Sequence, residues 1–133
     1  MLYISVMEMN KDELKDRFKQ FALRIIRLCQ SLPKEKTADV IRGQLLRAGT
    51  STGANYRAAC RAKSTADFIY KLGIVEEELD ESLYWMELLI EAKILKEHLV
   101  SELMKEGNEL LSIIISSLKT SKGKSKIIPN SEI

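Results

Sequence analysis

The sequence predicts an all-α protein that folds as an antiparallel up-down four-helix bundle. Apolar residues recur every three or four positions in four separate segments, which is the spacing of one buried helix face. Only two prolines and six glycines interrupt the 133 residues. Hydrophobic residues make up 45% of the chain and charged residues 30%, a balance typical of helix-rich globular proteins and not of disordered ones.

The first two predicted helices differ in the size of the residues that they bury. The first ends at Pro33, because the proline ring is incompatible with a continuing helix interior. Its stripe is Leu14, Phe18, Phe21, Ile25, Leu28 and Leu32. The second helix runs up to Ser64, and its stripe is smaller: Ile41, Leu45, Ala48, Thr52, Asn55 and Ala59. Glycines at 43, 49 and 53 in this pattern indicate close backbone packing.

The third predicted helix begins at Ser64-Thr65-Ala66-Asp67, a sequence similar to a capping box. Its core stripe is Phe68, Leu72, Val75, Leu79, Ser82, Met86 and Leu89, and a flanking line is formed by Lys71, Ile74, Glu78, Glu81, Trp85 and Leu88. A break near residues 93–97 precedes a fourth helix with the stripe Leu99, Leu103, Leu110, Ile114 and Leu118. We therefore expect a bundle over residues 1–119 and a disordered basic tail over 120–133.

Composition argues against several classes of function. Cys29 and Cys60 lie in different predicted helices without metal-ligand spacing, so they are expected to be buried free thiols. His98 is the only histidine, and no Glu-x-x-His motif is present. We expect no metal, no cofactor and no catalytic residue. No apolar run is long enough to span a membrane, and no signal peptide is recognised, which favours the cytoplasm.

Charge is distributed unevenly along the chain. Residues 1–63 contain 13 Lys and Arg against 6 Asp and Glu, whereas residues 64–118 contain 4 against 12. The second helix carries the cations that we take as candidates for nucleic-acid binding: Arg42, Arg47, Arg57, Arg61 and Lys63. Arginine forms bidentate hydrogen-bonded pairs both with phosphate and with carboxylate. These residues are thus expected to bind either RNA or DNA backbone, or the acidic third helix of a neighbouring subunit.

The second and third helices present more apolar surface than one bundle seam requires, which predicts a homo-oligomer. The candidate interface residues are Asn55, Tyr56, Ile74, Glu78, Glu81, Trp85 and Leu88. The alternative role of Asn55 is to set the register between packed helices. For Trp85, core packing within the monomer is an equal alternative. An enzyme with a composite site at a subunit interface, using Glu78, Glu81 or Tyr84, is the least favoured hypothesis.

Several segments of this chain, taken in order, resemble the four-helix bundle family of 23S rRNA intervening-sequence proteins. They are Ser31-Leu32-Pro33, Gln44 to Ala48, Ser51 to Arg57, Arg61 to Ser64, Asp67 to Leu72, and Glu78 to Leu89 with Tyr84-Trp85. The resemblance covers about residues 15 to 118. Ala58-Ala59 stand where the family usually has a glutamate, so no role of that glutamate carries over.

The resemblance implies a ring-shaped homopentamer of bacterial origin, encoded within insertions in the large ribosomal RNA gene. The chain is also similar to the accessory variability protein of diversity-generating retroelements, which implies reverse transcriptase, a ribosome-associated protein, RNA or DNA as partners. We expect a non-enzymatic oligomeric scaffold or adaptor that binds nucleic acid or a ribonucleoprotein. The alternative is a protein–protein interaction oligomer without nucleic-acid binding.

Overall fold

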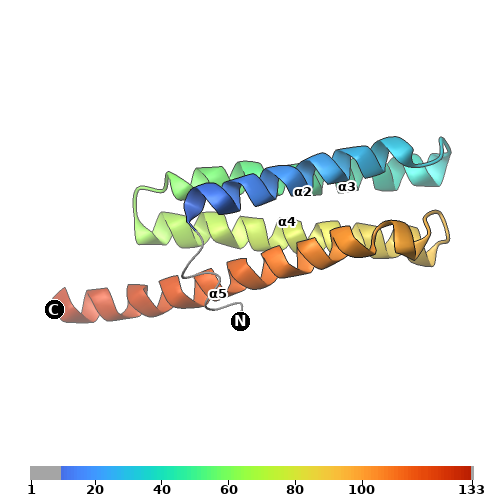
Figure 1. Ribbon diagram of the computed structural model, residues 1–133. Coiled ribbons are helices and arrows are strands. Elements are labelled where there is room, and N and C mark those ends of the chain that lie inside the picture. Colours follow the sequence, from blue (N-terminus) through green and yellow to red (C-terminus); the bar gives the residue numbers. More distant parts are fainter. Residues whose placement is uncertain (1–9, 133) are drawn as a thin grey trace.

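The computed structural model describes residues 10–132, with side chains described through residue 123. Within this range the chain forms α2 (Lys11–Ser31), α3 (Lys36–Cys60), α4 (Thr65–Glu91), the short 3-10 helix η1 (Glu97–Leu99) and α5 (Ser101–Glu132). Consecutive helices run antiparallel to each other, as Figure 1 shows. The predicted all-α, up-down four-helix bundle is confirmed.

Local sequence signals explain where the helices begin and end. The side chain of Asn10 accepts a hydrogen bond from the backbone N–H of Glu13 at 2.8 Å, which satisfies one free donor in the first turn of α2. Ser64 does the same for the N–H of Asp67 at 3.1 Å, so the predicted start of the third helix is confirmed. Pro33 follows directly after the end of α2, as predicted.

The apolar stripes meet in one continuous core. Every residue of the first predicted stripe is buried, and so are most residues of the other stripes. Asn55 and Phe68 are half-buried, and Leu99 is 65% exposed because η1 holds it at the turn that precedes α5. The largest fully buried side chains are Phe18, Phe21, Ile25, Leu45, Leu72, Leu79, Met86, Leu89, Leu110, Ile113 and Ile114.

One glycine of α3 allows this helix to lie close against α2. A Cβ added at Gly49 would lie 2.8 Å from Cγ2 of Ile25, so close packing requires glycine there. At Gly53 an added Cβ would lie 3.4 Å from Cβ of Phe18, which is an ordinary van der Waals contact. Gly43 is different, since a Cβ added there would meet nothing within 4 Å and would face open space.

The four seams of the bundle are not equally closed. α3 packs extensively against both α2 and α4, and α4 packs against α5, whereas α2 and α5 approach each other at few positions. Figure 1 shows α5 continuing beyond the ends of the other three helices. The seam between α2 and α5 is thus the most open one.

α5 continues to Glu132, through the segment for which the sequence predicts a disordered tail. Lys119, Thr120 and Lys122 are exposed, so this part of the helix is not organised by an apolar stripe. Extending a helix that has already formed fixes one residue per hydrogen bond, whereas nucleating a new helix fixes several. The packed part of α5 can therefore propagate into a polar segment that would not form a helix by itself.

Candidate functional site

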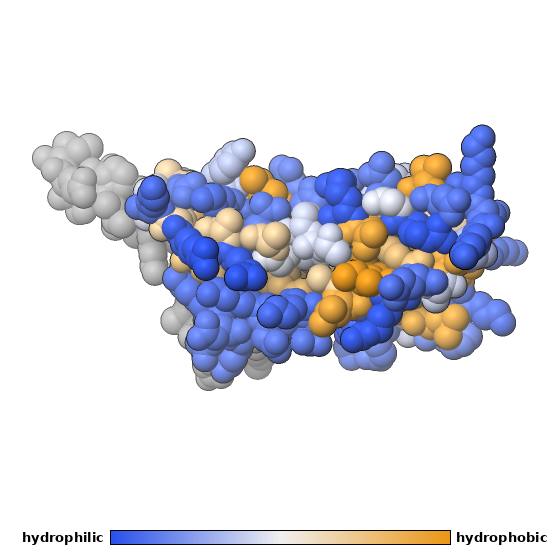
Figure 2. Space-filling view, turned by 90° about the horizontal axis from the view of Figure 1, so that it is seen from above, coloured by the Kyte–Doolittle hydropathy of each residue, from blue (hydrophilic) through white to orange (hydrophobic). Residues whose placement is uncertain are grey.

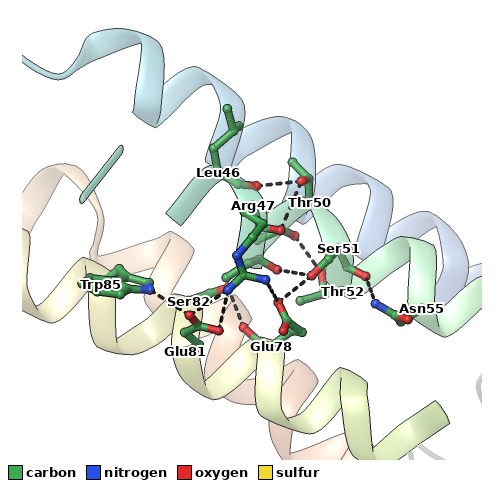
Figure 3. A network of polar contacts seen from close by, with 12 residues as sticks. Leu46, Arg47, Thr50, Ser51, Thr52, Asn55, Glu78, Glu81, Ser82 and Trp85 are labelled. Atoms are coloured by element: carbon green, nitrogen blue, oxygen red, sulfur yellow. Dashed lines mark hydrogen bonds and ion pairs between the residues drawn. The ribbon is translucent and has the colours of Figure 1, made fainter. Parts of the chain in front are cut away.

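A polar network joins α3 to α4 at the middle of the bundle, and Arg47 is at its centre (Figure 3). Its guanidinium donates to Oε2 of Glu78 at 3.0 Å and to both carboxylate oxygens of Glu81, at 2.7 and 2.8 Å. The hydroxyl of Ser51 donates to Oε2 of Glu78 at 2.7 Å, and the indole N–H of Trp85 donates to Glu81 at 3.4 Å. Arg47 thereby finds its carboxylate partners within its own chain.

The electrostatics of this network follow from its hydrogen bonds. The guanidinium of Arg47 lowers the pKa of the Glu81 carboxyl below its usual range, and Trp85 adds a second donor with the same effect. Glu81 in turn raises the pKa of Arg47. Both groups are therefore charged at neutral pH, and each is already engaged by the other.

Arg42 has a structural position at the end of α2. It donates to three backbone carbonyls, those of Cys29 at 2.9 Å, Leu32 at 3.0 Å and Pro33 at 2.9 Å. Cys29 lies in the last turn of α2 and Leu32 is its C-cap, where a helix leaves carbonyls without an i+4 partner, and Pro33 follows the helix. Asp39 forms an ion pair with the same guanidinium. The side chain of Arg42 thus closes the connection between α2 and α3.

Arg57 and Arg61 have a different environment. Both are exposed, and within residues 10–123 neither side chain forms an ion pair or hydrogen bond. They line a shallow trough of about 450 Å³ between α2 and α3, which Lys15 and Lys19 also border. Because positions four apart lie on one face of a helix, each wall of the trough presents one pair of cations. This arrangement is the strongest candidate for a functional site.

The lining of the trough combines small residues with charged residues of both signs. The small residues are Thr50, Gly53 and Ala54 of α3 and Ala22 of α2. Two acidic residues lie on the α2 wall, where Asp12 is 3.8 Å from Nζ of Lys15, and Asp16 is the second. Four cations against two carboxylates leave the trough net positive.

Figure 2 shows the face that α2 and α3 form together. The largest apolar patch lies toward the half of the face nearer the connection between the two helices, and the half that contains the trough is mostly hydrophilic. Leu23 of α2 and Leu46 of α3 are large apolar side chains that are 37% and 38% exposed. A polar site and an apolar surface thus lie side by side on one face.

Lys63 lies apart from the two trough arginines. It borders a separate hollow at the end of the bundle, together with Lys11 of α2, Ser64, Phe68 of α4 and Ser121 of α5. The five candidate nucleic-acid residues therefore occupy four places: Arg57 and Arg61 lie together, while Arg42, Arg47 and Lys63 each have separate surroundings. The i to i+4 spacing of Lys15 and Lys19 is the sequence signal for the α2 wall, and the sequence-based prediction did not include it.

The candidate interface residues of α4 lie along one line. Ile74, Glu78, Glu81, Trp85 and Leu88 are all half-buried, on the flank beside the core stripe. Tyr84 is 52% exposed and its ring meets that of Trp85 edge to face, with centroids 5.2 Å apart. Asn55 donates to the backbone carbonyl of Ser51 at 2.9 Å, so its amide is anchored on its own helix.

Tyr56 lies in the core of the monomer and not on its surface. Only 6% of it is exposed, and its ring stacks on Phe18 with centroids 5.0 Å apart. Burial raises the pKa of its phenol, and the neighbouring thiol of Cys60 contributes in the same direction. In the folded chain Tyr56 therefore packs between α2 and α3.

Neither a metal centre nor a membrane-spanning helix is found in the part of the chain that the structure describes. No three His, Cys, Asp or Glu side chains gather there in a way that could hold a metal ion. Among the described helices, none combines the length and the apolar character that crossing a membrane requires. Cys29 is a buried free thiol, as predicted, and Cys60 is free but half-buried.

The fold is that of a small four-helix bundle protein, with ion pairs that join α3 to α4 and α2 to α5. The model of the family described as 23S rRNA-intervening sequence protein matches residues 11–116. The chain belongs to this family, as its sequence segments predicted. A comparison with curated proteins finds no match.

One solved structure shows the same fold. The chain is similar to a protein with unknown function from the S23 ribosomal protein family of Bacteroides thetaiotaomicron VPI-5482, with 39% sequence identity and a TM-score of 0.77. The match covers 84% of this chain and 99% of that chain. The match therefore spans almost the whole of that protein and most of this chain.

Proposed function

We propose that this protein is a non-enzymatic, oligomeric adaptor that binds the phosphate backbone of nucleic acid through the trough between α2 and α3. The observation that supports the proposal is the pairing state of the arginines. Arg42 and Arg47 are engaged by carbonyls and carboxylates of their own chain, whereas Arg57 and Arg61 have no ion-pair partner within residues 10–123. The guanidinium groups of Arg57 and Arg61 are therefore available to bind phosphate.

The character of the trough suggests how it binds. Its lining contains no aromatic side chain, so it offers no platform on which unpaired bases stack. Its cations come from two antiparallel helices, and residues four apart on one helix are separated by about 6 Å along the axis. Contacts with phosphate groups fix the position of the nucleic-acid backbone, but they do not read its base sequence directly.

The experiment is a binding titration with a fluorescently labelled RNA hairpin at low salt. We expect the Arg57→Ala/Arg61→Ala variant to bind at least about tenfold more weakly than wild type, because each charged hydrogen bond to phosphate contributes roughly 1.5–3 kcal/mol. Lys105→Ala is the matched control, since Lys105 is exposed on α5 and far from the trough lining. Equal affinity of the double variant and the control would contradict the proposal.

The alternative is an oligomer that binds only protein, and the apolar line on α4 favours it. This line leaves three apolar side chains half-buried in the single chain: Ile74, Trp85 and Leu88. The exposed Tyr84 lies beside Trp85. In the sequence-based form of this alternative, the arginines of one subunit bind Glu78 and Glu81 of the next. Arg47 satisfies both carboxylates within its own chain, so the contact between subunits would rest on the apolar side chains. A homopentamer is the assembly that the family resemblance suggests.

A further inference from the structure

A second groove lies on the side of α2 that faces α5, away from the trough. Its volume is about 380 Å³. One wall comes from the second half of α2 and the other from the connection between α4 and α5 and the first turn of α5. The lining residues are Arg24, Arg27, Leu28, Ser31, Leu95, Leu99, Val100 and Leu103. The groove thus occupies the least closed seam of the bundle.

The spacing of the lining residues gives the groove its shape. On α2 they fall at positions i, i+3, i+4 and i+7, which is one face of a helix over two turns. At 1.5 Å per residue, this wall is about 10 Å long. The groove is therefore a channel parallel to the helices, as long as two turns of another helix.

Its floor is apolar and buried, and its edge is apolar and exposed. Val100 and Leu103 are 1% and 5% exposed, and Leu28 is 8% exposed. Leu99 stands at the edge with 65% of its surface exposed, although its place in the sequence pattern is that of a core residue. Leu99 and the recessed floor together form the apolar lining of the groove, and an apolar stripe of a helix is the kind of surface that such a lining buries.

The cations at the rim have no counter-charge in the described part of the chain. Within residues 10–123, neither Arg24 nor Arg27 forms an ion pair. Further along the seam between α2 and α5, an arginine of α2 does have partners. Arg17 forms ion pairs with Glu106 at 2.7 Å and with Glu109 at 2.8 Å. One half of the seam is closed by its own charges, and the other half is left open beneath two arginines.

We propose that this groove docks an acidic amphipathic helix of a partner protein. Apolar residues of that helix at i, i+3, i+4 and i+7 cover Leu99 and the floor, and acidic residues beside this stripe pair with Arg24 and Arg27. Nucleic acid is a poor occupant, since the groove has an apolar floor and only two cations. The proposal is independent of the trough, and it gives the adaptor a separate protein-binding surface.

The test uses the full chain and a labelled synthetic peptide of about 16 residues, with leucines at i, i+3, i+4 and i+7 and glutamates at most other positions. A second peptide replaces every glutamate with lysine. We expect the acidic peptide to bind, and we expect Leu99→Asp and Arg24→Glu/Arg27→Glu each to weaken binding at least about tenfold. Tyr70→Asp is the control, because Tyr70 is 68% exposed on α4 and outside the groove.

Several outcomes would overturn the proposal. These are equal binding of the two peptides, unchanged affinity of both groove variants, and equal loss in the Tyr70→Asp control. A change in oligomer mass on Leu99→Asp, without peptide binding by wild type, would assign the groove to a second copy. Binding of wild type to anionic lipid vesicles but not to the peptide would assign it to a membrane. If Leu99→Asp loses helix content by circular dichroism, the comparison of wild type with Arg24→Ala/Arg27→Ala decides.

Discussion

Arg47 on α3 donates hydrogen bonds to both carboxylate oxygens of Glu81 on α4, at 2.7 and 2.8 Å. This contact joins the basic first half of the sequence to its acidic second half inside one chain. Arg57 lies further along α3 on the side that faces α2, and it meets no carboxylate within residues 10–123. Arg47 is engaged because α4 places two carboxylates beside it, whereas Arg57 lines the trough toward α2 and forms no ion pair within residues 10–123.

The pKa of Glu81 makes its contribution to stability depend on pH. Because Arg47 lowers the pKa in the folded state, the contribution is present above the unfolded value, near 4.5, and is lost as pH falls through the folded value. We expect Glu81→Gln to lower Tm at pH 7 and to lower it less at pH 3. Thermal unfolding followed by circular dichroism measures both differences.

Glu77→Gln is the control for this prediction, because Glu77 is exposed on α4 and forms no ion pair within residues 10–123. Its effect on Tm at pH 7 should be smaller than that of Glu81→Gln. A difference between wild type and Glu81→Gln that stays constant from pH 7 to pH 3 would show that the pairing with Arg47 does not carry the effect.

The sequence predicted the core of this fold well because helical periodicity depends on neighbours three and four residues apart. The stripe from Leu14 to Leu32 and the start of the third helix at Ser64 are local features, and both are confirmed. Leu99 belongs to the same kind of pattern, yet it is exposed because the chain turns there. Periodicity describes a helix face and does not indicate where the helix begins.

The partners of the arginines could not be predicted in this way. Arg42, Arg47 and Arg57 look alike in sequence, but they meet different surroundings. Arg42 meets the end of α2, Arg47 meets carboxylates of α4, and Arg57 lines the trough. The contact of Arg47 with Glu81 spans 34 positions, and that of Arg42 with three carbonyls depends on the path of the chain around Pro33. Such contacts depend on the rotation of each helix within the bundle.

Two glycines of α3 should respond in opposite ways to the same substitution. At Gly49, a methyl group would meet Ile25 at 2.8 Å, so we expect Gly49→Ala to destabilise the fold by about 1–3 kcal/mol. At Gly43 the space is open, and Gly43→Ala should stabilise the helix by up to about 1 kcal/mol. Urea unfolding of both variants measures these changes. The same sign at both positions would contradict the close approach of α2 and α3.

Ionisation of Tyr56 should require unfolding of the bundle. Burial raises the pKa of its phenol, so its neutral form stabilises the fold below the unfolded pKa, and this stability is lost as pH rises through the folded value. We expect one tyrosinate absorbance step to coincide with alkaline unfolding and to be missing in Tyr56→Phe. The control is Tyr70→Phe, which should leave the step that coincides with unfolding in place, because Tyr70 is 68% exposed on α4 and outside the core. Ionisation of Tyr56 before unfolding would contradict its place in the core.

Trp85→Ala should shift the proposed assembly toward the monomer. The indole is half-buried in the single chain and lies beside the exposed Tyr84, so its loss removes apolar surface from the proposed contact. Light scattering coupled to size exclusion measures the mass. A wild-type mass near one chain of 15.2 kDa at micromolar concentration would refute the oligomer. Leu23→Ala is the control, since Leu23 lies on α2 and is similarly apolar and partly exposed, and it should leave the mass unchanged.

The dependence of RNA affinity on salt tests the role of the trough most directly. Each phosphate that a protein neutralises contributes about 0.7–0.9 to the slope of log K against log salt. We expect a steep slope for wild type, a slope smaller by about 1–2 for Arg57→Ala/Arg61→Ala, and an unchanged slope for Lys105→Ala. Equal slopes for wild type and the double variant, or wild-type affinity that does not respond to salt, would contradict nucleic-acid binding through Arg57 and Arg61.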